Sequence, residues 1–292
     1  MKIAVITYEA RGSYATTGVD DEDKILEDIL TELGLDFTFE VWSDSQVNWS
    51  AYTHLLMKSP WDYFDRYPEF LTWGKKIQSL GISVVNDMET VIRNSDKRYL
   101  LEIQERGFPI VPTIFNSKNQ IPDLEACFES FGTSQMVIKP TVSGGAKNTL
   151  KIERTTWKAH QSQIESLFAS EDFMLQPFVK EVAEVGEHSY LFFNGKFSHA
   201  VLKSARSGEF RVQHFFGGQI QTIDPTLIEL VFIQNIIDEF APDTLYARVD
   251  GVWIEGVFHL MELELIEPYL FLFTSKEGRQ NYKNAIKERF GA

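Results

Sequence analysis

The sequence predicts an α/β protein in which a doubly wound parallel sheet is followed by two α+β subdomains with antiparallel sheets. Two observations support this fold class. The first third of the chain alternates apolar strand-like runs with amphipathic helical runs, which is typical of a parallel sheet. Later strands lie much closer together, and two of them flank Asn194-Gly195, a dipeptide typical of tight hairpins.

The N-terminal unit is expected to span residues 1–94 and to hold four parallel strands. Their predicted positions are residues 2–8, 37–42, 53–57 and 82–86. A helix is predicted over residues 20–34, because its apolar side chains repeat at helical spacing and Gly34 can end it. A second helix is predicted over residues 68–81. The loop after the first strand lacks the G-x-G-x-x-G pattern, so we expect no dinucleotide site there.

The second unit is expected to span residues 95–179. It opens with a helix that Asn94 or Ser95 is predicted to cap and that Gly107 is predicted to end. Prolines at positions 109 and 112 then force an extended chain. Closely spaced strands are predicted over residues 136–140, 148–153 and 172–179.

The third unit is expected to span residues 180–292 and to contain the main antiparallel sheet. Its predicted strands are residues 188–193, 196–203, 245–254 and a run within 259–268. A long helix is predicted between them over residues 225–240, and a polar helix over residues 275–290 closes the chain.

Composition limits the classes of partner. The net charge of −14 and the pI near 4.9 give a surface that repels nucleic acid and anionic lipid. The first apolar run is too short for a signal peptide, and no run is long enough to span a membrane. Cys127 is the one cysteine, which fits a reducing compartment. We therefore expect a cytoplasmic protein, with a homodimer as one option for an oligomeric state that the sequence leaves open.

Two acids in an apolar strand are the most informative local feature. Glu262 and Glu264 are two positions apart, so both side chains point to one face of the strand. If a three-residue turn with Gly256 in its left-handed position joins this strand to the preceding one, Trp253 pairs with Val257 and Arg248 lies opposite Glu262. Arg248, Asp250, Glu262 and Glu264 then share a face. A two-residue turn would place Asp250 and Glu262 on opposite faces.

Clustered carboxylates on one sheet face have two interpretations. Oxygen ligands suit a hard cation such as Mg²⁺ or Mn²⁺, which bridges phosphate oxygens. Alternatively, the acids lie on a solvated face, where Arg248 neutralises one of them.

A glycine-containing loop follows the strand that ends near Lys139. Gly144 and Gly145 allow backbone amides to wrap around an anion, and Lys139 adds a positive charge. The segment is not a Walker A loop, because G-x-x-x-x-G-K-[ST] is missing. The alternative is an ordinary hairpin turn.

Further polar and apolar positions suit a nucleotide. The backbone and apolar side chains of Gln176, Pro177, Phe178 and Val179 suit a flat purine, and Glu187 could accept hydrogen bonds from a sugar diol. Lys203 and Arg211 are cations in an acidic protein, and residues 215–218 offer a second amide-rich turn. Each has a simpler alternative: a strand end, a solvated acid, or surface cations.

In order, these segments resemble the ATP-grasp carboxylate-amine ligases, the group of glutathione synthetase and D-alanine:D-alanine ligase. The resemblance covers roughly residues 95–270 and is carried by "SDKRYLL", "VIKPTVSGG", "LQPFV", "GEHS", "GEFRVQ", "RVD" and "ELELIEP". The whole chain, including "SPWDYFDRYPEFLTWG", is similar to the branch containing O-ureido-D-serine cyclo-ligase of cycloserine biosynthesis.

The resemblance implies a role for each matched residue. The two antiparallel subdomains would clasp ATP, with Mg²⁺ or Mn²⁺ as the metal. Expected nucleotide contacts are Lys97 and Lys139 on the phosphates, Ser143, Gly144 and Gly145 in a mobile flap, Gln176 to Val179 on adenine, and Glu187 or Glu184 on the ribose. Expected metal ligands are Asp250, Glu262 and Glu264. Expected catalytic residues are Arg211, which would steady an acyl phosphate, with Lys203, Arg248, Gly217 and Gly218. Many relatives have Asn at the position of Glu264, so the sharing of a second ion stays open.

The implied reaction activates a substrate carboxylate as an acyl phosphate, which an amine-type nucleophile then attacks, releasing ADP and phosphate. A small-molecule kinase and a non-catalytic nucleotide-binding module are the alternatives. A glycosidase or a zinc enzyme is disfavoured, because the tryptophans are scattered and zinc-ligand spacing is missing. Candidates for contact with the second substrate are Tyr8, Glu9, Arg11, Trp61 and Asp62.

Overall fold

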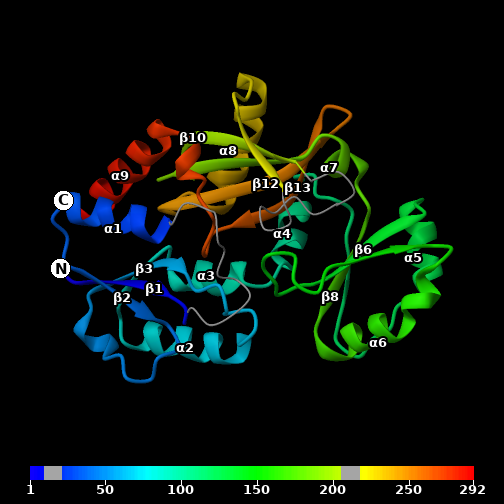
Figure 1. The fold of residues 1–292 in the computed structure, drawn as a ribbon, viewed down its shortest axis with the longest axis horizontal. Coiled ribbons are helices and arrows are strands. Elements are labelled where there is room, and N and C mark those ends of the chain that lie inside the picture. The colour runs from blue at the N-terminus through cyan, green and yellow to red at the C-terminus, as the bar shows by residue number, and fades with distance from the viewer. Residues whose placement is uncertain (10–21, 205–217) are drawn as a thin grey trace.

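We describe a computed structural model of the protein, which covers residues 1–9, 22–204 and 218–292. Its described part contains three sheets, each with helices packed against it (Figure 1). The N-terminal sheet lies at the lower left of this view, the central sheet at the right, and the C-terminal sheet along the top. The predicted fold class, a parallel sheet followed by two antiparallel ones, is confirmed.

The N-terminal sheet is parallel, with the strand order β2-β1-β3-β4. Its strands are β1 (Ile3–Thr7), β2 (Phe37–Val41), β3 (His54–Ser59) and β4 (Ser83–Val85). Helix α1 (Glu22–Glu32) buries Leu26, Ile29 and Leu30 on one face. Helices α2 (Tyr67–Ser79) and α3 (Met88–Asn94) cover the other face with an aromatic-rich core. Helices on both faces are what a doubly wound parallel sheet requires.

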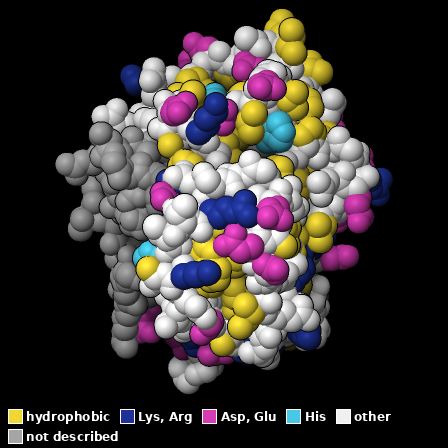
Figure 2. Space-filling view, turned by 90° about the vertical axis from the view of Figure 1, so that its right-hand side faces the viewer, with side chains coloured by type: hydrophobic (Ala, Val, Ile, Leu, Met, Phe, Trp, Pro, Cys, Tyr) yellow, Lys and Arg dark blue, Asp and Glu magenta, His cyan; other side chains and the backbone are white. Residues whose placement is uncertain are grey.

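The central sheet is antiparallel, with the strand order β5-β8-β6-β7. Its strands are β5 (Ile114–Asn116), β6 (Gln135–Pro140), β7 (Leu150–Glu153) and β8 (Phe173–Pro177). Helices α5 (Leu124–Phe131) and α6 (Gln161–Ser170) pack on one face through a separate apolar cluster, which contains the stacked rings of Phe168 and Phe173. On the surface seen in Figure 2, acidic and basic side chains lie side by side, and on α5 Glu125 and Glu129 pair with Arg154.

The C-terminal sheet is antiparallel, with the strand order β11-β10-β9-β12-β13. Its strands are β9 (Glu187–Phe193), β10 (Lys196–Ser204), β11 (Gln219–Ile223), β12 (Tyr246–Ile254) and β13 (Val257–Glu264). Helices α4 (Tyr99–Glu105) and α8 (Leu227–Phe240) contribute to the core on one face. Helix α9 (Lys276–Phe290) packs on the other side of the sheet, next to α1 (Figure 1). The short helix α7 (Lys180–Glu184) leads into β9.

The predicted cap of the helix after residue 95 was wrong. Asn94 ends α3 and Ser95 follows it, whereas α4 begins at Tyr99. The Asn94 side chain instead donates to the Leu263 carbonyl and accepts from the Leu265 N–H, which joins α3 to β13. A long-range partner thus overrides the local capping preference. The end near Gly107, which has a positive φ, agrees with the prediction.

Boundaries between the three units stay predictions. Helix α4 packs with the core of the C-terminal sheet, and Ile110 bridges to Leu260 of β13. The segment after residue 95 therefore contacts the C-terminal sheet before the chain enters the central one. In the described part of the chain, no helix is both long and apolar enough to cross a membrane.

Candidate active site

The hairpin of β12 and β13 positions the acids, and its register corrects the sequence prediction. The turn has two residues, since Ile254 pairs with Val257, and both Glu255 and Gly256 have positive φ. The predicted three-residue turn and the pairing of Arg248 with Glu262 were therefore wrong. Arg248 lies opposite Glu264 instead.

A two-residue turn alone would place Asp250 and Glu262 on opposite faces of the sheet, but a β-bulge brings them back to the same face. The register shifts between Asp250 and Gly251, and Met261 is the extra residue on β13. Because one unpaired residue moves the following side chains to the other face, Asp250 comes to lie opposite Glu262. The acids of the two strands therefore meet on one side of the sheet despite the short turn.

The three predicted metal ligands converge. One carboxylate oxygen from each of Asp250, Glu262 and Glu264 lies within 4.8 Å of the others. All donors are oxygens, which suits Mg²⁺ or Mn²⁺ better than zinc. Burial and the neighbouring acids raise the pKa of Glu264 to about 7. This repulsion is what a divalent cation would relieve, so the residues present fit the metal that the resemblance implies.

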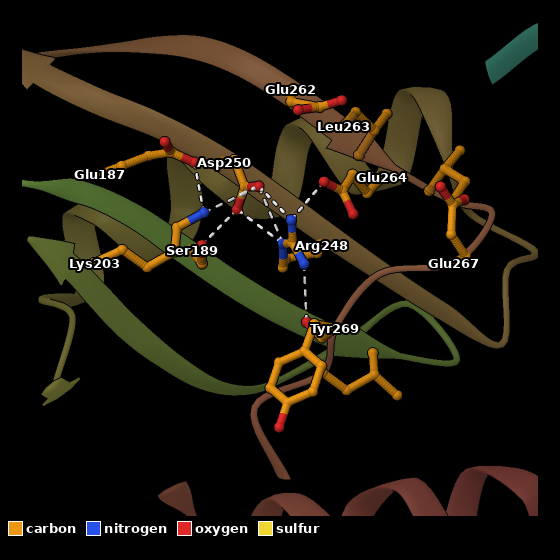
Figure 3. Close-up of polar contacts among 12 residues, drawn as sticks. Glu187, Ser189, Lys203, Arg248, Asp250, Glu262, Leu263, Glu264, Glu267 and Tyr269 are labelled. Atoms are coloured by element: carbon orange, nitrogen blue, oxygen red, sulfur yellow. Dashed lines mark hydrogen bonds and ion pairs between the residues drawn. The ribbon is translucent and has the colours of Figure 1, made fainter. Parts of the chain in front are cut away.

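Two cations lie beside these acids (Figure 3). Arg248 donates to both oxygens of Asp250, at 2.8–3.1 Å, and to Glu264 at 2.5 Å. Lys203 is 2.5 Å from Glu187 and 3.4 Å from Asp250. Burial alone would raise the pKa of Asp250, but these two cations lower it to about 2. Asp250 is thus an anion that positions both cations.

The glycine loop is held over the site by contacts at both ends. Lys97, which precedes α4, donates to the Ser143 carbonyl at 2.6 Å and pairs with Glu262 at 3.0 Å. A Cβ at Gly144 would lie 2.6 Å from the Phe64 ring, and Lys147 pairs with Asp65. The loop therefore bridges the acid site and the segment after β3.

Lys139 is the predicted phosphate contact on β6. Burial and the nearby Lys97 lower its pKa, while Glu262 and Glu187 oppose that shift. Among the described residues, none forms a hydrogen bond or ion pair with the Lys139 ammonium. Its charge is therefore available to a ligand.

The segment predicted to contact adenine lies at the end of β8. The Gln176 amide donates to the Thr113 hydroxyl at 2.9 Å, which fixes the side chain. Lys151 lies 3.8 Å from the centre of the Phe178 ring. These side chains form an apolar wall with one oriented amide.

These groups line one cavity of about 330 Å³ between the central and C-terminal sheets. Of the predicted site residues, the cavity wall includes Lys97, Lys139, Ser143, Gly144, Gly145, Gln176, Pro177, Phe178, Val179, Glu187, Lys203, Arg248, Asp250, Glu262 and Glu264.

Other predicted residues lie elsewhere. Glu184 is exposed on α7 and Gly218 is buried, and neither lines the cavity. Arg11, Arg211 and Gly217 lie outside the described residues.

Of the candidates for the second substrate, Trp61 lines the cavity and its ring lies 5.9 Å from that of Tyr8. Asp62 instead accepts a hydrogen bond from the Trp42 indole at 2.6 Å, and Glu9 is exposed.

Glu267 is a cavity residue that the sequence reasoning missed. Burial and the neighbouring Glu264 and Glu262 raise its pKa well above the usual range. The available signal was a third acid, three positions after Glu264, in a run that is otherwise apolar.

The parallel N-terminal sheet, the two antiparallel sheets that meet at a charged cavity, and the acid hairpin define the class: the chain has the fold of the ATP-grasp ligases and is similar to them in sequence. A family model described as the N-terminal domain of D-cycloserine synthetase DcsG matches residues 3–86. Over 262 residues the chain is 27% identical to the cycloserine biosynthesis protein DcsG of Streptomyces lavendulae, covering 85% of this chain and 87% of that protein.

Further relatives and solved structures agree with this class. A probable alpha-L-glutamate ligase of Ectopseudomonas mendocina is 26% identical over 156 residues, which is 52% of this chain and 50% of that protein. The crystal structure of D-cycloserine synthetase DcsG matches with a TM-score of 0.85 and 24% identity over 99% of both chains. D-alanine–D-alanine ligase from Bacillus anthracis in complex with ATP matches with a TM-score of 0.68 and 17% identity, over 100% of this chain and 96% of that one. Both structures share the fold.

Proposed function

We propose that the protein uses ATP and Mg²⁺ to activate the carboxylate of a small amino acid or amino-acid derivative, which an amine-type nucleophile then attacks. The observation that carries this proposal is the cavity. Four cations, Lys97, Lys139, Lys203 and Arg248, line it together with three carboxylates within 4.8 Å of one another. Such a site can hold a polyphosphate inside a protein whose net charge is −14.

Each side of the cavity has a separate task in this proposal. Mg²⁺, held by Asp250, Glu262 and Glu264, would neutralise phosphate charge. Lys139 on β6 of the central sheet and Lys97, which precedes α4, bind phosphate oxygens. Arg248 and Lys203, fixed by Asp250, stabilise the charge that develops as the phosphoryl group moves to the substrate carboxylate. Gln176 to Val179 form the adenine wall.

Exclusion of water is the task of the glycine loop. An acyl phosphate hydrolyses if water reaches it, so the site must close before transfer. The contact of Gly144 with Phe64 and the pairing of Lys147 with Asp65 hold this loop against the segment after β3. The substrate carboxylate would then lie between the loop and that segment, near Trp61.

The names of the relatives support an amino-acid-derived substrate. One is a cycloserine biosynthesis protein and another a probable alpha-L-glutamate ligase. A cytoplasmic location and a homodimer stay predictions.

The test is ADP release with Mg²⁺ over single and paired amino acids, with hydroxylamine present to trap an acyl phosphate as a hydroxamate. We expect carboxylate-dependent ADP release and a hydroxamate, and a fall of about 10²- to 10³-fold in Glu262→Gln. Glu105→Gln, an exposed acid on α4, is the matched control and should keep full activity. A stable phosphorylated product without hydroxamate would instead identify a kinase. Full activity of Glu262→Gln would refute the metal assignment.

A further inference from the structure

The cavity contains two charged side chains that form no ion pair with any described residue. Seven other charged groups on its wall are paired: Lys97 with Glu262, Lys203 with Glu187 and Asp250, and Arg248 with Asp250 and Glu264. Lys139 and Glu267 are the exceptions. One cation and one anion of the cavity are therefore left for charged groups of the ligands.

Lys139 and Glu267 belong to different parts of the wall. Lys139 lies on β6 in the central sheet, close enough to Lys97 for their charges to interact, and suits phosphate. Glu267 follows β13, and its carbonyl accepts a hydrogen bond from the Trp61 indole at 3.3 Å. Figure 3 shows the Glu267 carboxyl apart from the group formed by Arg248, Asp250 and Lys203. It therefore lies where the C-terminal sheet meets the N-terminal unit.

The surroundings of Glu267 favour a cationic ligand group. Its carboxyl is half-buried near the like charges of Glu264 and Glu262, so a positive group would relieve both burial and repulsion. A metal ion held by Asp250, Glu262 and Glu264 would offset the charges of those three acids, but the carboxylates that converge within 4.8 Å do not include that of Glu267. The aromatic rings of Trp61 and Tyr63 line the same cavity, and such rings are favourable neighbours for an ammonium group.

We propose that Glu267 binds the ammonium group of the substrate whose carboxylate is activated, so that the protein selects α-amino acids over simple carboxylic acids. This inference rests on the proposed ligase function and specifies its substrate class. Glu267 is a specificity-determining residue here: it holds the end of the substrate opposite to the carboxylate, which faces Arg248, Lys203 and the metal ligands.

The experiment compares amino acids with counterparts that lack the amine, for example alanine with propionate and serine with 3-hydroxypropionate. ADP release gives kcat and KM, and calorimetry with a non-hydrolysable ATP analogue and Mg²⁺ gives binding without turnover. For the native protein we expect at least tenfold weaker binding and a higher KM for the desamino compounds. Glu267→Gln should raise the KM for the amino acid at least tenfold, leave the desamino compounds unaffected, and leave the KM for ATP and the Mg²⁺ dependence within twofold.

One further variant serves as a control for this role. Glu105→Gln is the surface control and should behave as native. Thermal unfolding of each variant shows whether the fold is kept.

Different failures have different meanings. If Glu267→Gln changes the KM for ATP or the Mg²⁺ dependence and not that for the amino acid, Glu267 belongs to the nucleotide site and the inference is wrong. If the native protein releases ADP equally well with amino acids and desamino compounds, the inference fails while the ligase function stands. If the native protein binds no carboxylate and releases no ADP, both fail.

Discussion

Two buried carboxylate clusters in this molecule differ in what surrounds them. Glu22, at the start of α1, pairs with Lys58 at 3.0 Å and accepts hydrogen bonds from the Leu270 and Leu272 N–H groups, and both charged side chains are at most 3% exposed. Asp250 is as deeply buried, at 1%, but it and its neighbours line a cavity. The first cluster joins the N-terminal unit to the loop after β13, and the second faces a ligand.

The two clusters differ in whether the fold itself supplies partners for all the carboxylate oxygens. Each Glu22 oxygen has a partner from the fold itself, so the cluster is complete without a ligand. The cavity wall instead carries five acids, Glu187, Asp250, Glu262, Glu264 and Glu267, some of them close enough to repel. A buried charge with all its partners indicates a structural role, while an incomplete set in a cavity indicates a site for metal and substrate.

The largest expected effect comes from the same substitution in both clusters. Glu22→Gln leaves the buried Lys58 without its counter-charge, so we expect the free energy of unfolding to fall by about 3 kcal/mol or more. Glu262→Gln should change it by no more than about 1 kcal/mol, because Glu262 is 30% exposed and Lys97 keeps the Ser143 carbonyl. Denaturant unfolding measures both. Equal losses at the two positions would remove the distinction between the clusters.

A smaller effect is expected from Gly144→Ala, which tests whether activity at the cavity cluster depends on closure of the glycine loop. The Glu22 cluster has no such loop over it in the described part of the chain. The Cβ of Gly144→Ala would meet the Phe64 ring at 2.6 Å, so the closed loop should be destabilised by about 1–2 kcal/mol. We expect about tenfold slower ADP release with little change in overall stability. Phe64→Ala removes the ring that the new Cβ would meet. Gly144→Ala should therefore cost less activity in a Phe64→Ala background than in the native protein. Additive losses would contradict the contact.

The smallest effect concerns pH and the Glu22 side of the molecule. His199 is buried, and its ring nitrogens lie 2.9 Å from the Leu270 carbonyl and from the Ser198 hydroxyl. Burial lowers its pKa below the usual 6.5. The unfolded chain then binds the proton more readily, so this contribution to stability is present above pH 6.5 and is lost as the pH falls towards the lowered value. Unfolding of His199→Asn should depend less steeply on pH between 5.5 and 7.5 than that of the native protein; equal slopes would contradict this.

Much of the fold could be predicted because its signals are local. The alternating runs of the N-terminal third and the Asn194-Gly195 turn, where Phe193 pairs with Lys196, are set by neighbouring residues. The capping of α4 could not be predicted, because Asn94 is recruited by Leu263 and Leu265 on β13. The strands β5 and β11 and the helices α5 and α6 were also not predicted, although α5 buries Leu124, Cys127 and Phe128 at helical spacing.

The sequence predicted which residues form the candidate site better than it predicted how they are arranged. Residue types and order indicated Asp250, Glu262 and Glu264, but the turn length and register came out wrong because no local signal marks Met261 as a bulge. Glu22 looked like an ordinary acid in the first turn of a helix, since its partners Lys58 and Leu270 are far away in the chain. Charges that are satisfied across such distances need coordinates to be recognised.

The bulge at Met261 also sets how this hairpin can change in evolution. Because the side on which Glu262 and Glu264 emerge depends on the number of residues after Gly256, many point mutations between them leave that side unchanged. Loss of a single codon there would turn both acids to the opposite side of the sheet. Natural variation in this segment should therefore consist of substitutions, with length changes absent or occurring in compensating pairs.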